Sequence, residues 1–243
     1  MELLEYLLLA GSAFVGSVIS AIVGMIGGVV LLSLMTFFLP LSVVVPIHGI
    51  VQLASNLSRL ISLRQHIVRK IIAPTLLTLP IGTALGTLLL DKLIHQELFY
   101  LLIVALILYV LFKPKKMPSL QIPYWAYSIL GLFVGVLNPI IGAIGPIYGP
   151  FLLRDDLIKE EIIATQATLQ AVSHLMKIPA FLYLGFRYEE HLLLFIIMIL
   201  AVILGTKYGI RLFKRINEEN FRLFYRAALL FAAIRLLYKA AGG

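Results

Sequence analysis

Two apolar stretches of the sequence each carry a row of polar side chains at helical spacing. In the first stretch, the row consists of His48, Gln52, Ser55, Asn56 and Arg59. In the second stretch, it consists of Gln166, Gln170, Ser173, His174 and Lys177. At about 100° per residue, the first row falls within roughly 100° of one helix face. Amide, hydroxyl and imidazole groups with a cation at one end are suited to bind the oxygens of an oxyanion, which accept several hydrogen bonds.

The cations and imidazoles of these rows have two interpretations each. Arg59 and Lys177 either offset the charge of a substrate or snorkel to the membrane surface and set the topology. His48 and His174 either relay protons or form hydrogen bonds to a neighbouring helix. The sequence leaves both alternatives open.

A glycine-rich break precedes each row. The first is GMIGG at 24–28, and the second runs from 138 to 146 and reads NPIIGAIGP. Glycine permits backbone conformations that a Cβ forbids and proline removes a helical N–H, so we expect the helix to break at both places. The helix that starts after each break would direct unpaired N–H groups and its positive dipole end at an anion. The alternative is close helix packing through small residues.

The acidic residues avoid the interior of every apolar stretch. All 12 lie at segment ends or in connections, at positions 2, 5, 91, 97, 155, 156, 160, 161, 189, 190, 218 and 219. A carrier of Na⁺ or protons and an intramembrane aspartyl protease both need buried carboxylates. The pattern therefore disfavours both classes and favours an anionic substrate.

Other chemistry has little support in the sequence. Ser173 and His174 are neighbours, and neighbours on a helix point about 100° apart, so they do not form a nucleophile and its base. The chain has no cysteine, which removes thiolate metal sites and thiol nucleophiles. We expect no enzymatic activity, no metal and no cofactor.

The composition places these residues in a membrane. Of the 243 residues, 61% are apolar and 13% are charged, whereas a globular domain has about 45–50% and about 25%. Apolar stretches lie at approximately 3–23, 26–39, 43–63, 71–90, 98–112, 123–138, 140–153, 162–184, 190–208 and 220–238. The second and seventh have 14 residues each, which rise about 21 Å against a hydrocarbon core of roughly 30 Å. Each is a tilted short helix, a half-helix in a broken span or a re-entrant hairpin.

The charges predict the side of each connection. Residues 64–70, 113–116 and 211–219 carry an excess of Lys and Arg and are placed inside, whereas 91–97 and 185–190 are placed outside. Both termini are then outside, in a multi-pass protein of the cell membrane. The N-terminus has no basic segment, so the first stretch is a span and not a cleaved signal peptide. The net charge of +8 is scattered over helix ends and connections, so we expect no nucleic-acid partner.

The two halves of the sequence resemble each other. A shift of 118 residues aligns 23–27 with 141–145, and a slightly larger shift aligns 82–86 with 205–209. The first shift also places Gln52, Ser55, Leu57 and Arg59 on Gln170, Ser173, Leu175 and Lys177. Three collinear matches indicate an internal duplication.

Corresponding connections of the two halves are predicted on opposite sides of the membrane. We therefore expect an all-α bundle of two inverted five-segment repeats, each with a short broken or re-entrant helix. The repeats occupy 1–112 and 123–243, and the connection 113–122 between them is cytoplasmic. The alternative is that duplication merely enlarged a structural membrane protein.

These motifs resemble the sulfite exporter TauE/SafE family of membrane transporters. The resemblance rests on the break at 24–28, on SNLSR at 55–59 before a basic loop, on GTxxG at 82–86, and on their repetition. It implies export of small sulfur-containing anions such as sulfite, sulfoacetate or other organosulfonates, or of other organic anions. The chain departs from the pattern at Pro146, where the repeat predicts glycine as at Gly28, and in the acidic connection 154–161.

We therefore expect a secondary transporter that exports a small anion by alternating access at a midplane site between the repeats. The expected substrate-binding residues are Gly24, Gly27, Gly28, His48, Gln52, Asn56, Arg59, Asn138, Gly142, Gly145, Gln170, Ser173, His174 and Lys177. The alternatives are an anion channel, an intramembrane enzyme and a structural membrane subunit. The expected partners are the anionic substrate and the lipid bilayer, and the sequence leaves open whether the chain forms a homo-oligomer.

Overall fold

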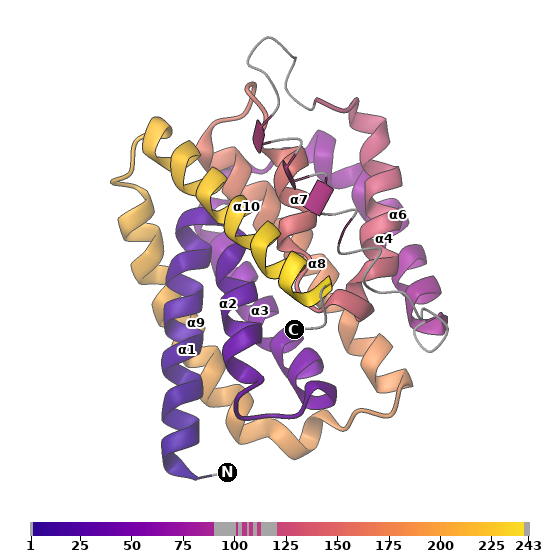
Figure 1. Cartoon of the computed structure of the whole chain (residues 1–243), viewed down its shortest axis with the longest axis vertical. Helices are drawn as coiled ribbons and strands as arrows, with labels where there is room; N and C mark the ends of the chain where they lie inside the picture. Colours follow the sequence, from indigo (N-terminus) through magenta and orange to yellow (C-terminus); the bar gives the residue numbers. More distant parts are fainter. Residues whose placement is uncertain are drawn as a thin grey trace.

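The computed structural model describes residues 2–89 and 121–240, together with residues 101, 104, 105, 107, 108, 111 and 112. Over this part of the chain the protein forms nine α-helices, three short 3₁₀ helices and no strand (Figure 1). The prediction of an all-α fold is thus confirmed for these residues. The expected segment at 98–112, the connection 113–122 and the charged loop 91–97 lie wholly or partly outside the described residues.

The observed helices follow the predicted apolar stretches. The α-helices are α1 (Leu3–Val23), α2 (Ile26–Met35), α3 (Leu41–Leu63), α4 (Arg69–Leu88), α6 (Tyr127–Ile141), α7 (Gly145–Leu152), α8 (Lys159–Tyr183), α9 (Leu192–Phe213) and α10 (Glu218–Ala240). The 3₁₀ helices are η1 (Arg64–His66), η3 (Tyr124–Ala126) and η4 (Tyr188–His191).

The exterior of the bundle is apolar and its interior is partly polar. Among the described residues, four helical segments are long and apolar enough to cross a membrane, namely α1, α4, α6 with η3, and α9 with η4. Their outward side chains include Leu77 and Leu204, which are 74% and 61% exposed. Helices α3 and α8 pack extensively against each other, and the polar rows that they carry are buried. This arrangement is that of a multi-pass membrane bundle.

The long helices pair across the two halves of the chain. Helix α4 packs on α6, and α9 packs on α1. A Cβ on Gly86 would lie 2.8 Å from the Val136 carbonyl carbon, and a Cβ on Gly209 would lie 2.6 Å from the Ala21 Cβ. Only glycine permits so close an approach. Gly86 and Gly209 occupy corresponding positions in the sequence repeat. The pairing of α4 with α6 therefore corresponds to the pairing of α9 with α1.

Helices α2 and α7 fold back along the helices that precede them. A Cβ on Gly16 of α1 would lie 3.3 Å from the Leu31 Cβ of α2, whereas one continuous helix would separate these residues by about 22 Å. In the second half, the Tyr127 hydroxyl at the start of α6 donates to the Phe151 carbonyl in the last turn of α7 (2.8 Å). Both halves therefore begin with a helical hairpin, which is one of the three forms open to the short stretches.

The hairpins differ from the expectation in two details. Helices α2 and α7 have 10 and 8 residues, not 14, so neither reaches across a bilayer. The second break also starts later than Asn138, because α6 continues through Pro139 to Ile141. A proline in the last turn removes only one intrahelical bond and its φ suits a helix. The chain turns instead at Gly142, where φ is 80°, as it does at Gly24, where φ is 79°.

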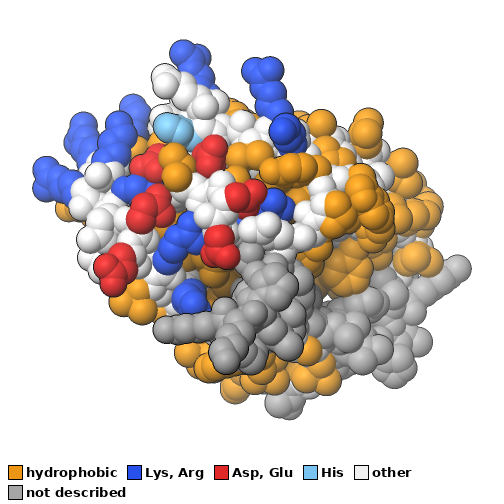
Figure 2. All heavy atoms as spheres, turned by 90° about the horizontal axis from the view of Figure 1, so that it is seen from above, with side chains coloured by type: hydrophobic (Ala, Val, Ile, Leu, Met, Phe, Trp, Pro, Cys, Tyr) orange, Lys and Arg blue, Asp and Glu red, His pale blue; other side chains and the backbone are white. Residues whose placement is uncertain are grey.

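The connections of the bundle gather at two opposite ends. At one end, Arg154 Nη1 donates to the Ile122 carbonyl (3.1 Å) and the Lys159 ammonium donates to the Ile216 carbonyl. We call the end formed by 64–70, 121–123, 153–161 and 211–218 the basic end. Figure 2 looks onto it, and Lys and Arg side chains project from it around a group of acids.

The other end holds the N-terminus. Tyr6, Phe38, Phe186 and Tyr188 pack there against one hydrophobic cluster, and α8 runs its 25 residues from the basic end to this one. Among the described residues, the connections predicted inside thus lie at the basic end, and the connection at 185–190, predicted outside, lies at the N-terminal end. Helix α1 starts at the N-terminal end (Figure 1), whereas its counterpart α6 starts at the basic end.

Candidate functional site

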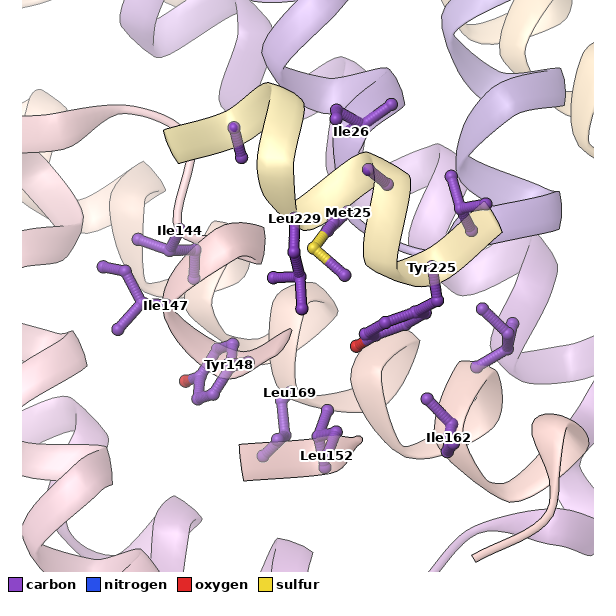
Figure 3. Packing of buried hydrophobic residues seen from close by; sticks show 14 of the residues in the cluster. Met25, Ile26, Ile144, Ile147, Tyr148, Leu152, Ile162, Leu169, Tyr225 and Leu229 are labelled. Atoms are coloured by element: carbon purple, nitrogen blue, oxygen red, sulfur yellow. The ribbon is translucent and has the colours of Figure 1, made fainter. Parts of the chain in front are cut away.

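The turns of the two hairpins meet inside the bundle. A Cβ on Gly145, the first residue of α7, would lie 3.1 Å from the Cα and the carbonyl oxygen of Met25. Figure 3 shows Met25 among residues of α10 and α7, with Leu229 and Tyr225 beside it. The first turns of α2 and α7 are therefore neighbours, although they come from different halves of the chain.

Arg59 holds the C-terminal end of α1. Its Nη1 donates to the carbonyl oxygens of Ser20 (2.6 Å) and Gly24 (3.1 Å), and its Nη2 donates to Asn56 Oδ1. The last carbonyls of a helix carry the negative end of the helix dipole, so a cation stabilises them; the Ser20 carbonyl also accepts the Gly24 N–H (2.8 Å). The side chain is completely buried and does not snorkel to the surface.

Lys177 does the same for α6. Its Nζ donates to the carbonyl oxygen of Gly142 (2.5 Å), and its side chain is completely buried. Asn138, in the last turn of α6, donates through Nδ2 to the Ser173 carbonyl (2.7 Å). Because Arg59 and Lys177 correspond in the repeat, the same cationic contact is made in both halves.

The row of α8 is tied to both turns. Gln170 Nε2 donates to the Gly24 carbonyl (3.0 Å), and Gln166 Nε2 donates to the Gly145 carbonyl (3.2 Å). The Tyr225 hydroxyl of α10 donates to Gln166 Oε1 (3.1 Å). These amides therefore hold the backbone of the turns in place.

Gln52 is the exception among the buried amides. It is 1% exposed, yet neither its Nε2 nor its Oε1 has a hydrogen-bond partner in the described part of the chain. It lies eleven residues from each end of α3, and its Nε2 would be 3.3 Å from a Cβ on Gly28, in the first turn of α2. Its counterpart Gln170 is bonded to Gly24. Among the described residues, the Gln52 amide therefore lacks the kind of bond that Gln170 makes.

The two histidines lie next to each other between α3 and α8. Their rings are 5.7 Å apart in an edge-on arrangement, and His48 Nε2 donates to the Gly28 carbonyl (2.9 Å). The Nδ1 atoms of His48 and His174 have no partner among the described residues. In a neutral ring with Nε2–H, Nδ1 accepts a hydrogen bond from a protonated oxyanion, and after protonation it donates one.

The electrostatics of the region favour an anion. Arg59 and Lys177 form no ion pair among the described residues, and no group of three His, Cys, Asp or Glu side chains is found there. Each helix end offers the cation about half a negative charge, so the two cations, when both are protonated, leave net positive charge in a buried region. A bound anion would offset it.

The predicted residues lie in one buried cluster, but they contact different partners. The predicted side chains, from His48 to Lys177, are at most 4% exposed. Gly28 lies at Gln52, whereas Gly27 contacts Gly16 and Ser20 of α1 and serves close packing.

Sequence reasoning missed three residues of the cluster, Met25, Tyr148 and Tyr225. The Tyr148 hydroxyl lies 3.2 Å from Ser173 Oγ. Tyr148 lies on the short helix α7. Its place in the apolar stretch after the second glycine-rich break is the one sequence feature that could have identified it.

The turn at Gly24 gives a direct stability prediction. We expect Gly24→Ala to lower the free energy of unfolding by about 1–3 kcal/mol, because alanine is strained at φ 79° and its Cβ would meet Gln166 Oε1. Gly11→Ala is the matched control, since a Cβ there has nothing within 4 Å and alanine favours a helix by about 0.5–1 kcal/mol. Thermal unfolding in detergent micelles measures both variants. Equal stability of the two would show that the turn does not require glycine.

One comparison identifies a family. The family model described as Sulfite exporter TauE/SafE matches residues 8–236 of the chain. No curated protein and no solved structure is similar enough to match the chain.

Proposed function

Because the chain belongs to the sulfite exporter TauE/SafE family, a family of membrane transporters, we propose that it exports a small sulfur-containing oxyanion. Sulfite, sulfoacetate and related organosulfonates are the substrate class. The observation that carries the proposal is Gln52, a buried amide at the first turn of α2 that has no hydrogen-bond partner among the described residues. An unsatisfied buried polar group costs about 1–3 kcal/mol, and an anion that accepts the N–H bonds of Nε2 removes the cost of that donor.

The proposed site has two kinds of residue. Gln52 and the N–H groups of the first turn of α2 bind the oxyanion, and the Nδ1 atoms of His48 and His174, which have no partner among the described residues, remain available for further hydrogen bonds. Arg59 and Lys177 offset its charge while they hold the helix ends. Asn56, Asn138, Gln170 and Ser173 keep the turns in position and act on the substrate indirectly.

In our proposal, the two halves are inverted five-segment repeats that alternately open the site to either side of the membrane. Two observations support it. Corresponding helices pair across the halves, and the site side chains are buried from both ends, as in an occluded state. The basic end is cytoplasmic, both termini are outside, and the protein resides in the cell inner membrane.

The membrane potential supplies the driving force in this proposal. An inside-negative potential favours exit of an anion by about 2.3 kcal/mol per charge per 100 mV, which is roughly a 50-fold change in the equilibrium gradient. The described interior has no carboxylate to bind a coupling cation, which agrees with a uniport.

Flux of labelled sulfite from proteoliposomes tests the function. We expect efflux to rise when the interior is made negative with a K⁺ gradient and valinomycin, and protein-free liposomes to show no such flux. Absence of sulfite and sulfoacetate flux at either sign of the potential would contradict the proposal. Single-channel currents in planar bilayers would assign the site to a channel instead.

A further inference from the structure

The outward face of α9 changes its chemistry near the basic end. In the middle of the helix the exposed side chains of this face are aliphatic, and they include Ile196, Leu200 and Leu204. The next exposed positions on the same face are Lys207 and Arg211. At 100° per residue, these residues all fall within about 80° of the helix circumference. The face that contacts lipid therefore ends in two cations.

The position of Lys207 along the helix matches the edge of the hydrocarbon core. The membrane-spanning segment that α9 forms with η4 starts at Tyr188, and the distance from Tyr188 to Lys207 is about 28 Å in helical geometry. This is close to the roughly 30 Å of the core. Tyr208 follows Lys207 and stacks on Phe14 of α1, with 6.4 Å between the ring centroids. Tyr and Trp rings are enriched at the headgroup level, so Lys207 and Arg211 lie at the depth of lipid headgroups.

These two cations have no carboxylate partner in the described part of the chain. None of the ion pairs found there includes Lys207 or Arg211, and α9 itself contains no Asp or Glu. Helix α1, which packs against α9, carries its one acid, Glu5, in its first turn at the opposite end. A cation on a lipid-facing surface extends its side chain to the membrane interface. The headgroup phosphates there supply the complementary charge.

The other end of the same segment lacks such cations. Arg187, which precedes η4, lies 3.1 Å from Glu189 and 2.8 Å from Glu190. The exposed side chains at the start of α9 are Leu192 and Leu193. The cations without a carboxylate partner on the described face of α9 are therefore confined to the basic end. Figure 2 shows Lys and Arg side chains at the edge of that end, on the side where Figure 1 places α9.

We propose that Lys207 and Arg211 bind the headgroup of an anionic phospholipid in the leaflet at the basic end. The two cations donate to the phosphate oxygens, and the acyl chains lie along Leu200 and Leu204. Charge complementarity selects this class of lipid, because a zwitterionic headgroup neutralises its own phosphate whereas an anionic one keeps a net negative charge. Each Lys or Arg near a membrane surface favours an anionic lipid by about fivefold in binding. This surface lies outside the central site and does not depend on the identity of the transported anion.

Native mass spectrometry of the whole chain in detergent tests the inference. Titration with phosphatidylglycerol and with phosphatidylcholine of the same acyl chains gives the Kd of the first bound lipid. We expect the wild type to bind phosphatidylglycerol about 25-fold more tightly than phosphatidylcholine, and the double variant Lys207→Gln, Arg211→Gln to retain a preference of less than about threefold. The exchange variant Lys207→Arg, Arg211→Lys keeps both charges and should keep the preference. Monodisperse elution in size-exclusion chromatography shows that these exposed substitutions leave the protein folded.

A lysine at the same end of the bundle provides the matched control. Lys70→Gln removes one positive charge, but the Lys70 ammonium lies over the Tyr124 ring, 5.7 Å from its centroid, and not on α9. We expect Lys207→Gln to lower the lipid preference about fivefold and Lys70→Gln to leave it within about twofold of the wild type. Equal losses in the two variants would reduce the effect to general surface charge and overturn the lipid site.

The remaining outcomes also decide the inference. A wild type without a preference for phosphatidylglycerol, or a double variant that keeps the preference, would overturn it. Displacement of the bound lipid by soluble glycerol phosphate would assign the cations to a free anion and overturn it as well. The double variant should transport sulfite at the wild-type rate in phosphatidylcholine liposomes. A wild type that transports no sulfite would contradict the proposed function and leave the lipid site unaffected.

Discussion

A Gln52→Leu variant is expected to lose transport while it keeps or gains stability. Leucine has a similar volume and no polar atoms, so the substitution removes two buried polar atoms that have no partner among the described residues. Removing an unsatisfied buried polar group is neutral or stabilising, by up to about 1–3 kcal/mol. Anion binding, in contrast, loses its side-chain donor at the start of α2. Because hydrogen bonds to charged groups contribute about 1.5–3 kcal/mol, sulfite flux should fall roughly 10- to 100-fold.

The equivalent substitution in the second half provides the matched control. Gln170→Leu removes the bond to the Gly24 carbonyl, so we expect it to lower the free energy of unfolding by about 0.5–1.5 kcal/mol. Thermal unfolding in detergent and sulfite flux in proteoliposomes, measured on both variants, give the comparison. Opposite effects on stability support the distinction between a free and a bonded amide. Normal flux in Gln52→Leu would remove Gln52 from the site.

The second large effect is expected at Arg59. An Arg59→Glu variant places a buried carboxylate against the Ser20 and Gly24 carbonyls, which it cannot bond and which carry the negative end of the α1 dipole. Leaving a buried charge without a partner costs about 3–5 kcal/mol, a large share of the total stability of about 5–15 kcal/mol. We therefore expect Arg59→Glu not to accumulate as a folded protein.

Arg59→Lys is the conservative comparison, because Lys177 makes the corresponding contact in the other half. One ammonium does not reproduce every bond of the guanidinium, so a loss of about 1–2 kcal/mol is expected, with the protein folded. The yield of monodisperse protein after size-exclusion chromatography and its unfolding temperature measure both variants. A stable Arg59→Glu variant would contradict the helix-capping role. A stable Arg59→Lys variant without flux would show that the guanidinium itself contacts the substrate.

Local features of the sequence predicted much of the site. Helix α1 has the predicted bounds of 3–23, because an uninterrupted apolar run between a charged terminus and a glycine allows only one placement of the helix. The polar rows lie in the interior, since helical periodicity assigns them to one face and lipid excludes that face from the surface. The turns at Gly24 and Gly142 were also recognisable as glycines at equivalent positions.

Other features were beyond local reasoning. Pro139 signals a break in the sequence, but its effect depends on how close it lies to the end of α6. Arg59 and Lys177 had two interpretations, because the carbonyls that they contact lie 35 or more residues away along the chain. Tyr225 was not expected in the site, since its partner Gln166 belongs to another helix.

The sequence by itself determined that this protein is a helical membrane protein with a duplicated pattern, a cationic interior free of acids, and the motifs of a transporter family. The first two properties follow from composition, periodicity and spacing, which each segment carries without reference to the others, whereas the family follows from resemblance. Only the tertiary structure decided that the cations hold helix ends, and that Gln170 is bonded while Gln52 has no partner among the described residues. The two amides occupy equivalent positions in the repeat, so no local signal separates them. The difference arises from a contact between residues 146 positions apart, which only the folded chain brings together.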